Sequence, residues 1–108
     1  MIMANNYTPN RFRNGTVTNL SYSTSAGAAV STAGFGAQTY WISLTAPGAL
    51  TSTGGVRYLI GKSVTASTSN GALLPLNWTE IVRVGPGEQL SAVSNDGVAG
   101  TLVVVELS

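Results

Sequence analysis

The chain has 108 residues, enough for one domain with a core that can fold independently. It contains no Cys and no His, so thiolate chemistry, the usual general base and the commonest metal ligand are excluded, and we predict no cofactor and no metal site. Only 8% of the residues are charged and the net charge is +1, which argues against nucleic-acid binding because that requires a basic surface. A surface so poor in charge is typical of protein interfaces.

Residues 1–13 are expected to form an extended N-terminal arm. Pro9 and the neighbouring Asn residues favour extended backbone over helix. In an extended chain Phe12 points away from Arg11 and Arg13. The arm is either a mobile terminus or a tether, with Phe12 in a partner's pocket and the arginines on its carboxylates.

No targeting or membrane segment is predicted. The first residues lack the basic start and the apolar run of a secretory signal. The long uncharged stretch over residues 14–56 is interrupted throughout by Gly, Ser and Thr, so it fails the test of about 20 mostly apolar residues for a membrane span.

Residues 14–108 are expected to form one β-domain. Alternating apolar residues bounded by turn formers predict strands over residues 15–25, 38–45, 56–60 and, as an edge continuation of the last, 63–69. In the second of these strands the alternation assigns Tyr40, Ile42 and Leu44 to the core and Trp41 to the opposite face.

The last third of the chain predicts a three-stranded antiparallel meander over residues 79–84, 88–94 and 101–107. In the first connection Pro86 and Gly87 predict a type II turn with a positive φ at Gly87. Alternation directs six apolar side chains of the meander toward a core: Val82, Val84, Leu90, Ala92, Leu102 and Val104.

Val103 and Val105 then point to the other side, where a solvated sheet carries polar residues. We therefore expect these two side chains to lie in a contact between subunits or under another layer of the protein.

No apolar pattern of helical spacing runs along the chain. Seven or so short strands separated by Gly, Pro and Ser predict an all-β fold. The expected architecture is a single-domain antiparallel β-sandwich or a barrel-like, jelly-roll-like domain with an extended N-terminal arm.

The inventory of reactive groups predicts a protein that is not an enzyme. The carboxylates are Glu80, Glu88, Asp96 and Glu106, which look too scattered for an acid–base pair. Two of them, Glu80 and Glu106, are interpreted as charges at strand ends that pair with an arginine of a nearby strand, Arg57 or Arg83. Ser and Thr are abundant, but no His is present to activate them.

The second half of the chain carries a set of turn and strand motifs. They are Leu73-Leu74-Pro75, Glu80 with Val82-Arg83-Val84, Pro86-Gly87-Glu88 with Leu90, Gly100-Thr101-Leu102 and Glu106-Leu107. This pattern resembles the C-terminal half of the small decoration, or cement, proteins of tailed bacteriophages. The sequence departs from the resemblance at Val103 and Val105, where a more polar outer face is expected.

The resemblance implies a structural protein of the virion. Such a protein binds the major capsid protein on the outer surface of the capsid and stabilises contacts between capsid subunits. The resemblance further implies a homo-oligomer, a trimer or a dimer, with no nucleic acid or membrane partner. The residues predicted to make contacts are Arg11, Phe12, Arg13, Trp41, Val103 and Val105.

An alternative from another class is a glycan- or receptor-binding module of a tail or head fibre. Tyr40 and Tyr58 are assigned to the core, which leaves Trp41, and with it Trp78, as rings on which a sugar could stack. A small hydrolase is a third interpretation. Sedimentation with phage heads or retention on a carbohydrate column separates the first two.

Overall fold

The computed structural model describes residues 14–22, 29–48 and 54–107. These ranges contain the following strands: β2 (Asn14–Tyr22), β3 (Val30–Ser31), β4 (Trp41–Thr45), β5 (Val56–Gly61), β6 (Ala72–Leu74), β7 (Thr79–Arg83), β8 (Gln89–Ser94) and β9 (Gly100–Leu107). Within the same ranges no helix is long and apolar enough to cross a membrane. The predicted arm, with Arg11, Phe12 and Arg13, lies outside the described residues.

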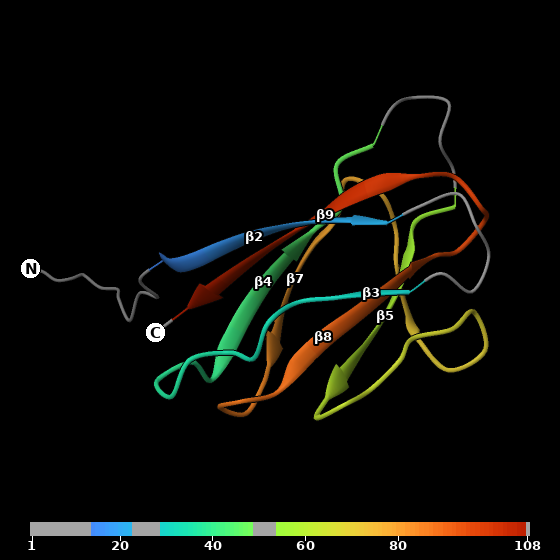
Figure 1. The fold of residues 1–108 in the computed structure, drawn as a ribbon. Helices are drawn as coiled ribbons and strands as arrows, with labels where there is room; N and C mark the ends of the chain where they lie inside the picture. Colours follow the sequence, from blue (N-terminus) through green and yellow to red (C-terminus); the bar gives the residue numbers. More distant parts are fainter. Residues whose placement is uncertain (1–13, 23–28, 49–53, 108) are drawn as a thin grey trace, which may run out of the picture.

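The strands form two four-stranded antiparallel sheets, which Figure 1 shows as two layers. The first sheet has the order β2-β9-β4-β7 and the second the order β3-β8-β5-β6. Consecutive described strands alternate between the sheets, except that β5 and β6 pair directly. This is the strand order of an eight-stranded jelly roll, so the predicted all-β sandwich is confirmed.

The predicted meander is wrong, although its three strands form where they were expected. β7 pairs with β4, β8 with β3 and β5, and β9 with β2 and β4, so none of the three pairs with another. The segment between β3 and β4 takes the hydrogen bonds that a β7–β8 hairpin would need. Phe35 N donates to Glu88 O at 2.8 Å, and Gly87 N donates to Phe35 O at 2.9 Å. Val84 N donates to Tyr40 O at 2.8 Å.

The turn between β7 and β8 nevertheless has the predicted local geometry. Gly87 has φ of 80°, and Glu88 N donates to Gly85 O at 3.1 Å. The Glu88 carboxylate accepts a further hydrogen bond from Gly85 N at 2.6 Å. The local sequence therefore sets the turn, while pairing with distant segments sets the sheet to which each flanking strand belongs.

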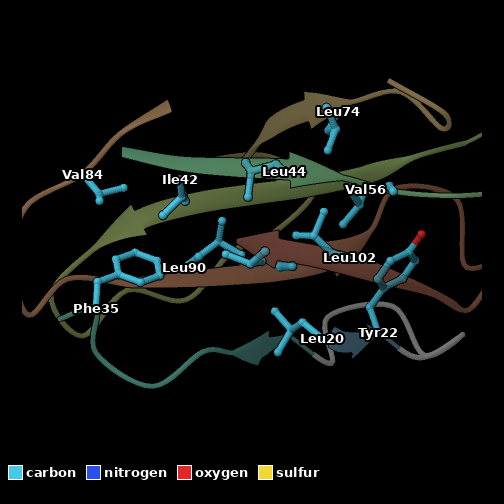
Figure 2. Packing of buried hydrophobic residues seen from close by; sticks show 13 residues of the cluster. Leu20, Tyr22, Phe35, Ile42, Leu44, Val56, Leu74, Val84, Leu90 and Leu102 are labelled. Atoms are coloured by element: carbon cyan, nitrogen blue, oxygen red, sulfur yellow. The ribbon is translucent and has the colours of Figure 1, made fainter. Parts of the chain in front are cut away.

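The core lies between the two sheets, and Figure 2 shows its side chains converging there. Five of the six apolar side chains assigned to the core of the last third are buried, and Val82 packs against the cluster partly buried. The fully buried leucines are Leu44, Leu74, Leu90 and Leu102. Each contributes about 1.5–3 kcal/mol relative to an exposed leucine.

Two predictions near strand ends are wrong. Tyr40 is 46% exposed because β4 begins only at Trp41, and alternation does not extend beyond the strand. Thr39 is buried in its place. Residues 63–69 are a loop and not an edge strand, since Ser63 has φ of 55°, which extended backbone does not allow.

Candidate interaction surface

The side of the first sheet that faces away from the core, called here the outer face, contains every described residue that the sequence singled out for contacts. Strand register aligns its central row: Val17 lies beside Val105, Val105 beside Ser43, and Ser43 beside Ile81. Three of these four side chains are apolar. A row of this kind crosses all four strands of the sheet.

Rows of different character flank the apolar row. On one side Asn19, Val103, Thr45 and Thr79 are in register, and the Thr45 and Thr79 hydroxyls are 2.9 Å apart. On the other side Trp41 is in register with both Leu107 and Arg83. The Arg83 guanidinium lies over the Trp41 ring, 5.7 Å from its centroid, in a cation–π contact.

The apolar row is open to solvent at both sheet edges. Val17 is 55% exposed and Ile81 is 53% exposed, while Val103 and Val105 on the central strand β9 are half-buried. Neighbouring side chains on the same face account for half-burial at a central strand.

The outer face contains one charged side chain among the described residues, Arg83. Its members follow from alternation along the four strands: Val17, Asn19, Ser21, Trp41, Ser43, Thr45, Thr79, Ile81, Arg83, Thr101, Val103, Val105 and Leu107. The hydroxyl and amide members can pair with a partner at little desolvation cost, whereas charged groups would resist burial.

The structure places Val103 and Val105 next to each other on one face of β9, and Trp41 on β4 is a diagonal neighbour of Val105 but lies four residue steps from Val103. Sequence reasoning missed Val17 and Ile81. Alternation already directs both away from the core, because Leu20 and Val82 occupy the opposite parity on their strands. What the sequence lacked was the register that places them in one row with Val105.

The four carboxylates each make their own contacts, and no three of them group at one site. Glu106 accepts hydrogen bonds from Thr39 Oγ1 at 2.6 Å and from Gly36 N at 3.1 Å. Asp96 accepts one from Val98 N at 3.1 Å. The predicted pairing of Glu80 and Glu106 with arginines is wrong, because Glu106 bonds to Thr39 and Gly36 and Glu80 bonds to Tyr58.

The arginine side chains instead donate hydrogen bonds to loops or stack on an aromatic ring. Arg57 donates from Nε to Asn95 Oδ1 at 2.7 Å and from a guanidinium nitrogen to Gly71 O at 3.1 Å. Among the described residues no three acidic side chains group as metal ligands would.

An open hollow of about 330 Å³ lies at the end of the sandwich beside Glu106. It is lined by Gly15, Thr16, Gly36, Ala37, Gln38, Thr39, Glu106 and Leu107. Glu106 is the one carboxylate in this lining, so the hollow does not hold the two carboxyl groups that glycoside hydrolysis uses.

Glu80 joins the two sheets. Its carboxylate accepts a hydrogen bond of 2.8 Å from the hydroxyl of Tyr58 on β5, while Glu80 itself is on β7. Burial, the hydrogen bond and the negative charge of Glu80 together raise the pKa of Tyr58 to about 12. Burial also raises the pKa of Tyr22, with a smaller contribution from Asp96.

No protein-family model, no curated protein and no solved structure matches this chain.

Proposed function

We propose that this protein is a decoration, or cement, protein of a phage virion. It binds the outer surface of the capsid and stabilises contacts between major capsid subunits. The observation that carries this proposal is the outer face, where an apolar row crosses four strands with a single charged residue beside it. Such a surface loses little on desolvation and is suited to a large, flat protein partner.

The exposure of this row supports a partner of protein character. A half-exposed valine gains free energy only when a neighbour removes it from water, at about 25 cal/mol per Å² of apolar area. Val17 and Ile81, at the two edges of the sheet, mark the width over which a partner would make this contact. Because many copies act on one lattice, each contact can be weak and the attachment still firm.

The fold is compatible with this role. Jelly-roll sandwiches occur in viral capsid domains and also in lectins, so this support is an analogy at the level of the fold. The motifs from Leu73 to Leu107 that resemble cement proteins span β6 to β9, which include β9, one of the two central strands of the outer face.

The glycan-binding alternative has weaker geometric support. Trp78 is 63% exposed, but it precedes Thr79, which pairs with Thr45, whereas Trp41 pairs with Arg83 at the other end of the ladder. Those two pairs are four residue steps apart along the strand, about 13 Å at 3.3 Å per residue. The two tryptophans therefore do not form one stacking platform.

The test is binding of purified protein to phage heads that lack it. Ile81→Lys should weaken binding at least about tenfold, because an ammonium without a partner would be buried in the contact. Leu73→Lys is the matched control: Leu73 is 42% exposed on β6 of the second sheet, and the substitution should leave binding unchanged.

Equal binding of both variants would contradict the proposal. So would a wild-type protein that does not sediment with the heads. Retention of the wild-type protein on a carbohydrate column, lost in Trp78→Ala, would favour the glycan-binding alternative instead.

A further inference from the structure

The edge strands of the two sheets differ in length and in charge, and β2 is the one that is both long and uncharged. β3 and β6, at the edges of the second sheet, have two and three residues. β2 and β7, at the edges of the first sheet, have nine and five residues. An edge strand presents unpaired backbone N–H and C=O groups, and the longer it is, the more readily it pairs with another strand.

β7 carries two charged residues that disfavour pairing of its edge with another strand. Glu80 on β7 is in register with the buried Leu44, so its carboxylate points inward, where it meets Tyr58. Inward-pointing charges and charged edge residues such as Arg83 oppose the addition of a further strand.

β2 lacks these devices over most of its length. It contains no charged residue and no proline from Asn14 to Tyr22. A register shift between Asn14 and Val17 disturbs only its beginning, which leaves residues 17–22 regularly paired with β9. Among the described residues, none pairs with the other edge of β2.

We propose that the edge of β2 that no described residue occupies pairs with β2 of a second copy of this chain. An open backbone edge accepts only another extended segment. A second copy offers one regular, uncharged edge of matching length, β2 itself. Antiparallel pairing of two identical strands generates a closed two-fold dimer, whereas pairing β2 with β7 of another copy would generate an open filament.

The dimer has a geometric consequence. The two-fold axis of an antiparallel strand pair is perpendicular to the sheet, so both first sheets join into one sheet with both outer faces on the same side. The apolar row of each copy ends at Val17 on β2, so both rows then reach the new seam on the same side of the joined sheet. The joined sheet offers a capsid partner an outer face twice as wide. That role rests on the proposed function, whereas the dimer itself does not depend on it.

The first test is the mass of the full chain in solution. Sedimentation or light scattering should give twice the 11.0 kDa chain mass. A monomer at the highest soluble concentration, or a trimer, would overturn the proposal. Head binding is not part of this measurement, so its failure and the failure of the proposed function are distinguishable.

Two lysine variants locate the interface. Asn19 on β2 and Thr79 on β7 are both exposed, and they stand at the two ends of one row across the sheet. Asn19→Lys should weaken the dimer at least about tenfold, since it places one lysine of each copy at the new seam, where the like charges repel. Thr79→Lys should leave the dimer intact. An equal loss in both variants would overturn the proposal by placing the contact on the outer face, and a loss in neither would overturn it as well.

Cysteine cross-linking reports the strand register, because the natural chain contains no cysteine. Single cysteines at Val17, Thr18, Asn19 and Ser21 should be oxidised alone and in pairwise mixtures. In an antiparallel two-fold pair, cross-links form only between positions whose residue numbers add to one constant sum. Cross-linking without such a sum, or equally efficient cross-linking of Thr79→Cys, would contradict the pairing.

Discussion

One central strand of each sheet, β8 in the second and β9 in the first, carries uncharged residues on its outward side, but only those of β8 are fully buried. On β8 of the second sheet, Ser91 and Val93 point away from the core and are fully buried. The loop over residues 62–71 contacts Ser91, because Ala66 N donates to Ser91 Oγ at 2.9 Å. On β9 of the first sheet, Val103 and Val105 remain half-exposed. One outward side is completed within the chain, and the other is left for a second molecule.

A carboxylate placed on the outward side of each sheet should give the largest difference in stability between the two sheets. Val93→Asp should destabilise the isolated domain by several kcal/mol, because a buried carboxylate without a partner is costly. Val17→Asp, at a position that is 55% exposed, should stay within about 0.5 kcal/mol of wild type. Chemical denaturation of both variants measures the difference, and equal losses would show that the two sides are not distinct.

A smaller effect is expected from removing one hydroxyl on each side. Ser91→Ala takes away the acceptor of Ala66 N in a buried site, which should cost about 1–3 kcal/mol. Ser43→Ala removes a hydroxyl from the outer face and should change the free energy of unfolding little. If Ser91→Ala is as stable as Ser43→Ala, the loop does not depend on this hydrogen bond.

Substitutions on the outer face should weaken binding to the capsid and leave the stability of the isolated domain nearly unchanged. Replacing both Val103 and Val105 with Thr keeps their shape but adds hydroxyls, each costing about 1–3 kcal/mol if a partner buries it without a hydrogen bond. Binding to phage heads should therefore weaken, roughly tenfold or more by the same estimate. Thermal unfolding of the isolated variant should change little. Unchanged binding would mean that these side chains face water in the assembled state.

The smallest effect concerns the bond that links the two sheets, and it appears only at alkaline pH. The pKa of Tyr58 is raised from 10.0 to about 12 in the folded protein, so the neutral hydroxyl is favoured by folding. Its contribution to stability is complete below pH 10 and is lost as the pH rises through about 12. Tyr58→Phe should flatten the fall in melting temperature over this window without abolishing it, because burial also raises the pKa of Tyr22. An unchanged slope in Tyr58→Phe would contradict this account.

Alternation along each strand predicted most of the core, because side-chain direction is a local property of extended backbone. It assigned Leu90, Leu102 and Val104 to the correct side, and it placed Val103 and Val105 opposite to them. It failed at Tyr40, where the strand had not yet begun.

Strand partners could not be predicted, because they depend on distant segments. The three strands of the expected meander are separated by short turns, yet residues near Phe35 occupy the bonding positions between two of them. For the same reason the sequence predicted only some of the residues of the outer face. Val17 and Ile81 join it through cross-strand register, which no local pattern encodes.

The alternation of consecutive strands between two sheets also bears on how the chain reaches this state. Among the described strands, only β5 and β6 are both consecutive and paired, so this hairpin is the one ladder that can form by closing a short loop. Every other ladder must wait for segments remote in sequence, and sandwiches of this kind refold in about milliseconds to seconds. During that interval the apolar rows of both sheets are unprotected. Newly made copies are therefore most prone to aggregate before the sheets have closed, and crowding of unfinished chains should limit their yield.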